Sequence, residues 1–342
     1  MEPLFLPFFF VAGALIGTFL TTCIERLPFE EEDFFYEEEE EPTEWYYRIP
    51  MFSLFLAMPL YTRFKSLIPA SRCPACKKRL PWREKIAIVS FIMLGGRCSG
   101  CRFKIPPRHL FVEIFTGVFF VIFAMRFGFT IDLLVSILLI SLFMVATVVD
   151  FRYQIIPDEV NLFGLIAGFI LAIGRSLYWT ANEFYLLKDQ VITKPMIIEL
   201  LRENILLKDG SLGFATSGFL AGAGSLMLLY YIGTALARTE AMGGGDVKLA
   251  GFIGLFLGAK GVLVALFWST ILGAVFGVAI LFFGWGIKEG GFTKFAFGPY
   301  ICAGTLLTLY FTVDGMVDAY MAFNGLILTL VTPRQEMFHE VI

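Results

Sequence analysis

The chain has 342 residues, of which 57% are hydrophobic and 17% are charged, and its mean hydropathy is +0.75. Typical soluble domains contain roughly 45–50% apolar residues, so this composition excludes an ordinary soluble domain and indicates an all-α polytopic membrane protein in contact with lipid. The net charge of −3 combines a basic segment with an acidic run of the same loop, and we expect no nucleic-acid partner.

Residues 1–24 predict the first transmembrane helix. The apolar run from Pro3 to Ile24 lacks a basic region before it and a small-residue cleavage site after it, and Arg26 follows it. A retained span is therefore expected rather than a cleaved signal peptide. Gly13 and Gly17 lie four positions apart, a pattern that lets membrane helices pack closely.

Residues 25–109 form the long polar region and carry 14 of the 27 Lys and Arg residues. Positive charge marks cytoplasmic loops, so we predict a cytoplasmic domain here and an N-terminus on the outer side. Residues 30–41 include nine acidic side chains, which predict either a solvated linker or an electrostatic attraction for a basic peptide. Residues 49–69 are apolar but broken by prolines and cations, which predicts an interfacial segment.

Two C-x-x-C pairs in this loop predict a metal site. Cys73 and Cys76 form the first pair, and Cys98 and Cys101 form the second after a gap of 21 residues. Four thiolates close the tetrahedral shell of Zn²⁺ and leave no position open, so the expected role is structural. Redox-active thiols are the alternative, although no thioredoxin-like βαβ pattern surrounds the pairs.

Residues 110–313 predict a membrane core of seven further helices, which gives about eight spans in all. The expected spans after the first cover residues 110–127, 131–149, 159–178, 212–236, 247–259, 262–286 and 295–313. Residues 178–209 interrupt the series and predict a polar segment on the outer side. The tail, residues 314–342, contains an apolar stretch that is too short to span, and it has no predicted location.

Counting sides from an outer N-terminus brings two carboxylates to the cytoplasmic face, although they are 96 positions apart. Asp150 ends the predicted third span and Asp246 opens the predicted sixth. Two carboxylates that share one proton can act as base and acid in aspartic-protease chemistry. Helix capping, or an ion relay as in a transporter, would use the same residues. Gly243, Gly244 and Gly245 precede Asp246 and permit positive φ or the close approach of a substrate backbone.

Several segments, in the order in which the family has them, resemble the type IV prepilin peptidases, the bacterial G-x-G-D membrane aspartyl proteases. These segments are Gly13–Pro28, Leu67–Cys76 with the later pair Cys98 and Cys101, Arg108–Glu113, Asp150–Asp158, Glu240–Leu249 with its Gly-Gly-Gly-Asp, and Phe297–Pro299.

The resemblance implies two activities. One is cleavage of the leader peptide from type IV prepilin or pseudopilin substrates, after a glycine at the cytoplasmic face of the bacterial inner membrane. The other is methylation of the new N-terminal amine with S-adenosyl-L-methionine. The implied residue roles follow the matching motifs: Asp150 and Asp246 are catalytic, Gly243, Gly245 and Asp158 belong to the substrate-binding loop, and Cys73, Cys76, Cys98 and Cys101 hold zinc.

The chain departs from the family pattern within the cytoplasmic domain. The linker over residues 28–72 is longer than usual, and Lys85 and Ala87 stand where the family commonly has Asn and Pro. Because this domain is the one that the resemblance links to methylation, a peptidase with a purely structural zinc domain is an alternative. An ion-coupled transporter and a membrane scaffold are alternatives from other classes. No glycine-rich S-adenosylmethionine loop of a Rossmann pattern is evident, so no cofactor-binding residues are predicted.

Overall fold

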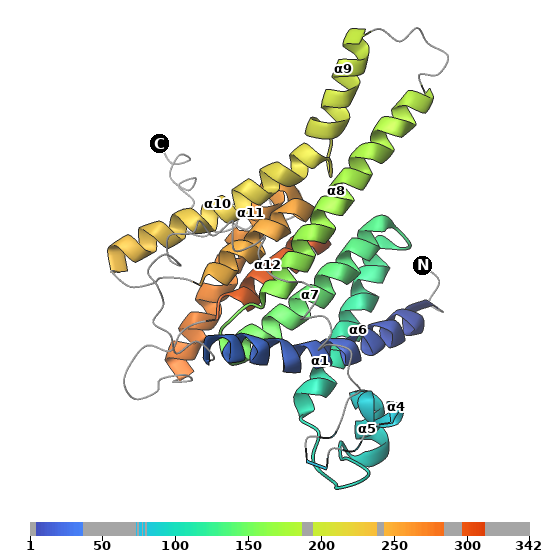
Figure 1. Cartoon of the computed structure of the whole chain (residues 1–342), viewed down its shortest axis with the longest axis vertical. Helices are drawn as coiled ribbons and strands as arrows, with labels where there is room; N and C mark the ends of the chain where they lie inside the picture. The colour runs from blue at the N-terminus through green and yellow to red at the C-terminus, as the bar shows by residue number, and fades with distance from the viewer. Residues whose placement is uncertain are drawn as a thin grey trace, which may run out of the picture. The chain divides into compact units, whose positions relative to one another are not determined.

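The structure, a computed structural model, describes residues 5–36, 73, 75–76, 78, 81–186, 194–237, 243–283 and 296–311 (Figure 1). Its elements over these residues are all helices. They are α1 (Leu6–Tyr36), α4 (Trp82–Lys85), α5 (Ala87–Leu94), α6 (Pro107–Phe127), α7 (Ile131–Tyr153), α8 (Asp158–Leu186), α9 (Lys194–Arg202), the π-helix η3 (Glu203–Leu207), α10 (Leu212–Ala237), α11 (Gly244–Phe283) and α12 (Gly298–Phe311).

Six helical stretches among the described residues are long and apolar enough to cross a membrane. They are Leu6–Leu27, Pro107–Phe127, Ile131–Tyr153, Asp158–Tyr185, Pro195–Leu236 and Gly244–Ala279. These stretches confirm the prediction of an all-α, multi-pass membrane protein. In a bilayer core no water is present to hydrogen-bond the backbone, and a helix satisfies its own N–H and C=O groups. The total of eight spans stays a prediction. For the expected span at 295–313, the structure describes the 14 residues of α12.

The predicted spans 247–259 and 262–286 both fall in α11, and the helix is interrupted between them. Gly258 has φ of 68° and ψ of 178°, which is not a helical conformation. Glycine enters this region without the steric penalty of a Cβ atom. The interruption therefore lies close to the break expected from the sequence, although the polypeptide remains helical on both sides of it.

The helix of the fourth predicted span, residues 159–178, continues beyond the predicted end of that span, because α8 ends at Leu186. The prediction stopped where polar residues begin. In the structure the carboxylate of Glu183 accepts a hydrogen bond from the side chain of Asn204 and lies 2.8 Å from Nζ of Lys208. A polar helix end is stable when its charged groups have such partners. The length of α8 therefore exceeds the length of its apolar run.

Other expectations fall partly or wholly outside the described residues. The first helix continues beyond the predicted end at Ile24 as far as Tyr36, and so includes the beginning of the acidic run. The remainder of that run, residues 49–69, the break at 287–294 and the tail 314–342 all lie outside the part of the chain that the structure describes.

The chain divides into two compact units. The first contains Met1–Ala167, Gly233–Leu249 and Gly286–Pro299, and the second contains Gly168–Ile232, Ala250–Trp285 and Tyr300–Ile342. All of the predicted site residues belong to the first unit. In that unit α6 and α7 run antiparallel, and α4 and α5 gather near the beginning of α6 (Figure 1).

Close packing of α1 against α6 confirms the role predicted for the small residues of the first span. A Cβ atom at Gly13 would lie 2.7 Å from Cα of Gly117, and one at Gly17 would lie 2.8 Å from Cα of Glu113. Both distances are too short for real atoms, so these two glycines let the helix backbones meet. The end of α1 then lies beside the segment that carries the four cysteines.

We predict that Gly13→Ala lowers the free energy of unfolding by about 1–3 kcal/mol, because the added methyl group forces the α1 and α6 backbones apart. The matched control is Gly224→Ala in α10, where an added Cβ meets no atom within 4 Å. That change should be neutral or stabilising by up to about 1 kcal/mol. Denaturant unfolding in detergent micelles measures both, and equal stability of the two variants would contradict the tight crossing.

Candidate functional site

The structure brings together the two carboxylates that the sequence places 96 positions apart. Asp150 lies in the last turn of α7, and Asp246 lies in the first turn of α11. Their side chains are close enough for the two charges to interact. Both are buried, with Asp150 5% and Asp246 9% exposed. Two buried carboxylates whose charges repel each other favour a state in which one of them holds a proton.

A backbone N–H group holds Asp150 in place. The N–H of Gly298 donates a hydrogen bond of 3.0 Å to Oδ2 of Asp150, within a buried environment. Gly298 is the first residue of α12, and the N-terminus of a helix carries partial positive charge. This contact places partial positive charge beside a carboxylate that lies near the C-terminal carbonyl groups of its own helix.

Ile156 packs between two glycines beside the carboxylates. A Cβ atom at Gly245 would lie 3.1 Å from Cβ of Ile156, whereas one at Gly298 would lie 3.0 Å from its Cδ1 and 2.6 Å from Oδ2 of Asp150. A side chain at Gly298 would therefore displace the carboxylate of Asp150, and one at Gly245 would crowd Ile156. The loop between α7 and α8, the beginning of α11 and the beginning of α12 meet at this one apolar side chain.

The three glycines before Asp246 have no unusual backbone angles, so what distinguishes them is the lack of a side chain. Gly244 and Gly245 are the first residues of α11, and neither adopts the positive φ that was expected as one explanation of the motif. The carbonyl of Gly243 accepts a hydrogen bond of 3.2 Å from the N–H of Asp246. Gly243 and Gly244 are exposed, so the backbone before the carboxylate is accessible.

Asp158, the third predicted acidic residue, contacts a cation instead of joining the carboxylate pair. Its Oδ1 lies 2.6 Å from Nζ of Lys248. Asp158 is the first residue of α8, and Lys248 follows Asp246 by two positions. This ion pair ties the loop after α7 to the first turns of α11, and so helps to fix the spacing of the two carboxylates.

The two C-x-x-C pairs converge as a second site. The four Sγ atoms of Cys73, Cys76, Cys98 and Cys101 all lie within 4.8 Å of one another. Sγ of Cys73 is 3.6 Å from that of Cys101, and Sγ of Cys76 is 3.9 Å from that of Cys98. A tetrahedron with Zn–S bonds of about 2.3 Å has S···S edges of about 3.8 Å. The cluster could therefore hold a metal ion such as zinc.

The thiols of this cluster shift one another's pKa values, and a cation between them would stabilise their ionised forms. The backbone N–H of Cys76 lowers the pKa of Cys73 to about 7. Although the backbone N–H of Phe103 acts in the same direction on Cys101, burial and the neighbouring thiols raise the pKa of Cys101 to about 11. Four thiolates at these distances need a positive charge between them, which fits a bound divalent metal ion.

A buried carboxylate on α6 connects the cysteine segment to the membrane helices. Glu113 is fully buried and accepts three hydrogen bonds: 2.7 Å from the N–H of Ala87, 2.8 Å from the N–H of Ile88, and 2.7 Å from Oγ1 of Thr18. The two N–H groups belong to the beginning of α5. Hydrogen bonds to a charged acceptor are strong, so Glu113 fastens α5 to α1 and α6.

The comparisons with known proteins agree with this pair of sites. Residues 11–127 match the family model described as Bacterial Peptidase A24 N-terminal domain, and residues 137–278 match the Type IV leader peptidase family. The chain belongs to the type IV leader peptidase family. The first match includes the four cysteines and Glu113, and the second includes Asp150, Asp158 and Asp246.

Curated members of the leader peptidase family show the same relationship over most of the chain. A Pseudomonas putida protein named "Prepilin leader peptidase/N-methyltransferase" is 28% identical over 91% of this chain and 92% of its own length. A Bacillus subtilis protein of the same name is 28% identical over 75% of this chain and 86% of its own length. For one from Myxococcus xanthus, 29% identical over 82% of this chain, the match spans 64% of that protein. No solved structure matches the chain.

Sequence reasoning missed three residues that shape the two sites. Gly298, Glu113 and Lys248 were not predicted as site residues, although each lay within a segment that resembled the family. An acidic residue inside an apolar span was the available signal for Glu113, since such a group needs a partner. Gly298 contacts Asp150 through its backbone N–H, and a pattern of residue types does not predict such a contact.

We predict that the purified protein contains one zinc ion per chain and that Cys98→Ser loses it, because three thiolates no longer close the shell. Cys23→Ala, which alters a buried cysteine of α1 outside the cluster, is the matched control and should retain the metal. Elemental analysis by mass spectrometry measures the zinc content of both variants. Unchanged zinc in Cys98→Ser would show that the cluster is not the metal site.

Proposed function

We propose that this protein is a prepilin leader peptidase and N-methyltransferase of the bacterial inner membrane, with its peptidase site at the cytoplasmic face. The observation that carries the proposal is the buried pair Asp150 and Asp246, whose charges interact and which lie in the segment that matches the Type IV leader peptidase family. Two carboxylates that share a proton are the chemical machinery of an aspartic protease.

The contacts around the pair suggest a division of labour. Because the N–H of Gly298 stabilises negative charge on Asp150, Asp150 acts as the base and Asp246 holds the shared proton. Asp150 takes a proton from a water molecule, whose oxygen then attacks the carbonyl carbon of the scissile bond. Asp246 donates its proton to the carbonyl oxygen. The C–N bond breaks as the proton on Asp150 passes to the leaving amine, and the carbonyl re-forms as the carboxyl product returns the other proton to the pair.

The glycines before Asp246 provide the place where a substrate backbone can bind. Gly243 and Gly244 are exposed, and without side chains they allow an extended peptide to approach the carboxylates. A prepilin presents a polar leader and an apolar helix, so the leader would lie in water while the apolar helix stays in lipid. The cleavage point is then held at the boundary, beside Asp150 and Asp246.

The metal ion has a supporting role in this proposal. The cysteine cluster would hold Zn²⁺ in a closed four-sulfur shell with no position for water or substrate. The ion therefore fixes the fold of the segment from Cys73 to Cys101 and takes no part in peptide cleavage. The methyl group for the N-methyltransferase activity would come from S-adenosylmethionine, which supplies an electrophilic methyl on a sulfonium ion.

We predict that Asp150→Asn and Asp246→Asn each abolish leader cleavage, by at least about a thousandfold, because an amide can neither accept nor donate the required proton. Asp132→Asn, at the opposite end of α7, is the matched control and should cleave normally. The assay follows the shift in mass of a purified prepilin in detergent. Zinc content should be unchanged in all three variants, and normal cleavage by either dyad variant would refute the assignment.

We predict that Gly298→Ala reduces the rate of cleavage by about 10- to 100-fold, because the new methyl group would displace the carboxylate of Asp150 from its position. Gly224→Ala is again the matched control, since its added methyl meets no neighbouring atom. Initial rates of prepilin cleavage distinguish them. A fully active Gly298→Ala enzyme would mean that the contact between Gly298 and Asp150 is unimportant for the chemistry.

A further inference from the structure

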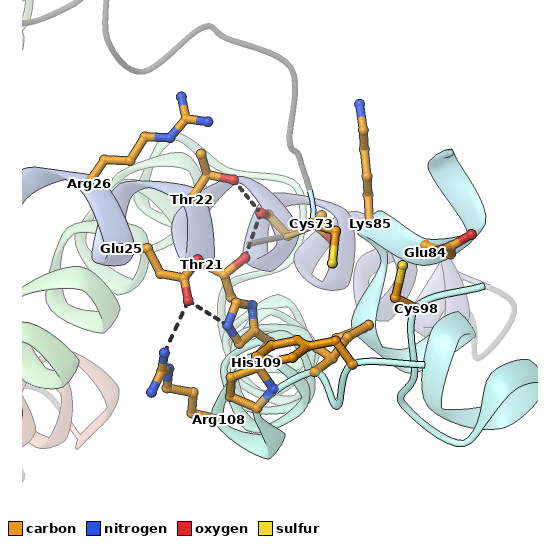
Figure 2. A pocket seen from close by; sticks show the side chains of 15 residues that line it. Thr21, Thr22, Glu25, Arg26, Cys73, Glu84, Lys85, Cys98, Arg108 and His109 are labelled. Atoms are coloured by element: carbon orange, nitrogen blue, oxygen red, sulfur yellow. Dashed lines mark hydrogen bonds and ion pairs between the residues drawn. The ribbon is translucent and has the colours of Figure 1, made fainter. Parts of the chain in front are cut away.

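A pocket of about 470 Å³ lies between the end of α1, the cysteine segment and the loop that enters α6 (Figure 2). Its lining does not include Asp150 or Asp246, so peptide cleavage does not account for it. Its volume falls within the range of about 300–1,000 Å³ that is typical of small-molecule sites. Cys73 and Cys98 contribute to one wall, which makes the pocket a product of the folded cysteine segment.

Charged groups of both signs meet on one side of the pocket. Oε1 of Glu25 lies 3.2 Å from Nη2 of Arg108 and 2.8 Å from Nε2 of His109 (Figure 2). The side chains of Glu25 and Arg108 remain 41% and 42% exposed, so both can also contact a ligand. A guanidinium group recognises a carboxylate, and a carboxylate recognises a cationic group. This side therefore suits a zwitterion.

An aromatic side chain and hydroxyl groups complete the lining. Phe103 is 44% exposed, in a segment outside the membrane helices, and Ile105, two positions later in the chain, also lines the pocket. An exposed phenyl ring in a pocket offers a flat surface on which a heteroaromatic base can stack. Thr21 and Thr22 of α1 also line the pocket and provide polar groups.

We propose that this pocket binds S-adenosylmethionine, and this proposal rests on the N-methyltransferase activity proposed above. The ligand has a planar adenine for Phe103, a ribose diol for the threonine hydroxyls, an amino-acid carboxylate for Arg108 and positive charge for Glu25. A peptide leader offers no purine base, so the exposed Phe103 favours the nucleoside. The pocket also gives the metal a function, since the ion would hold one wall of the ligand site.

Binding of labelled S-adenosylmethionine to the full-length protein, measured by equilibrium dialysis without substrate, tests the proposal. Phe103→Ala should weaken binding about tenfold, because the adenine base loses the aromatic face on which it stacks. Phe111→Ala is the matched control: Phe111 is 57% exposed on α6 and does not line the pocket. Its affinity should equal that of the wild type. Zinc content and leader cleavage should be unchanged in both variants.

A second pair of variants tests the charged side of the pocket. Glu25→Gln should weaken binding of S-adenosylmethionine at least fivefold, because an uncharged amide no longer attracts its positive groups or orients Arg108. The control is Glu183→Gln in α8, where another glutamate loses an ion pair with Lys208 outside the pocket. The loss for Glu25→Gln should be smaller for S-adenosylhomocysteine, which lacks the sulfonium charge.

The outcomes distinguish the assignment of the pocket from the N-methyltransferase activity itself. Weaker binding in Phe103→Ala and Glu25→Gln, with normal controls, supports the pocket as the methyl-donor site. Tight binding that neither variant weakens overturns the assignment of the pocket and leaves the N-methyltransferase activity in place. A wild-type protein that holds zinc and cleaves prepilin but does not bind S-adenosylmethionine overturns both.

Discussion

A carboxylate that is buried in a membrane protein needs donors close by, and three buried acids among the described residues lie beside helix N-termini. Glu113 accepts the N–H groups of the first two residues of α5, Asp150 accepts the N–H of the first residue of α12, and Asp246 lies in the first turn of α11. Unpaired N–H groups and the helix dipole stabilise negative charge at these places. Helix N-termini therefore help to keep these acids within an apolar environment.

The same arrangement separates a structural acid from the two acids that we propose to be catalytic. Glu113 accepts three hydrogen bonds, so its charge is fully satisfied and it serves as an anchor. Asp150 accepts one such bond and lies near a second carboxylate, which leaves its charge available for proton transfer. The number of donors around Glu113 and Asp150 thus agrees with the role that we propose for each. A reactive group is less completely satisfied than a structural one.

Much of this organisation was predictable from the sequence, and the parts that were not share a physical reason. Apolar length located the membrane helices, the spacing of Cys73, Cys76, Cys98 and Cys101 predicted their convergence, and counting sides brought Asp150 and Asp246 to one face. The true end of α8 was missed because Glu183 depends on Asn204 and Lys208, which follow much later in the chain. The hydrogen bond from Gly298 to Asp150 and the pocket beside Phe103 were missed because both arise from tertiary packing, which a residue pattern does not encode.

The hydrogen bonds of Glu113 have an evolutionary consequence. Two of its three donors come from α5, so a relative that had lost the cysteine segment would retain a charged group in its membrane core with most of its partners gone. The penalty for such an unpaired buried charge is several kcal/mol. Loss of the segment should therefore be accompanied by replacement of this acid with an apolar residue. The presence of a glutamate at this point of the second span would then mark, from sequence alone, those peptidases that have kept the additional domain.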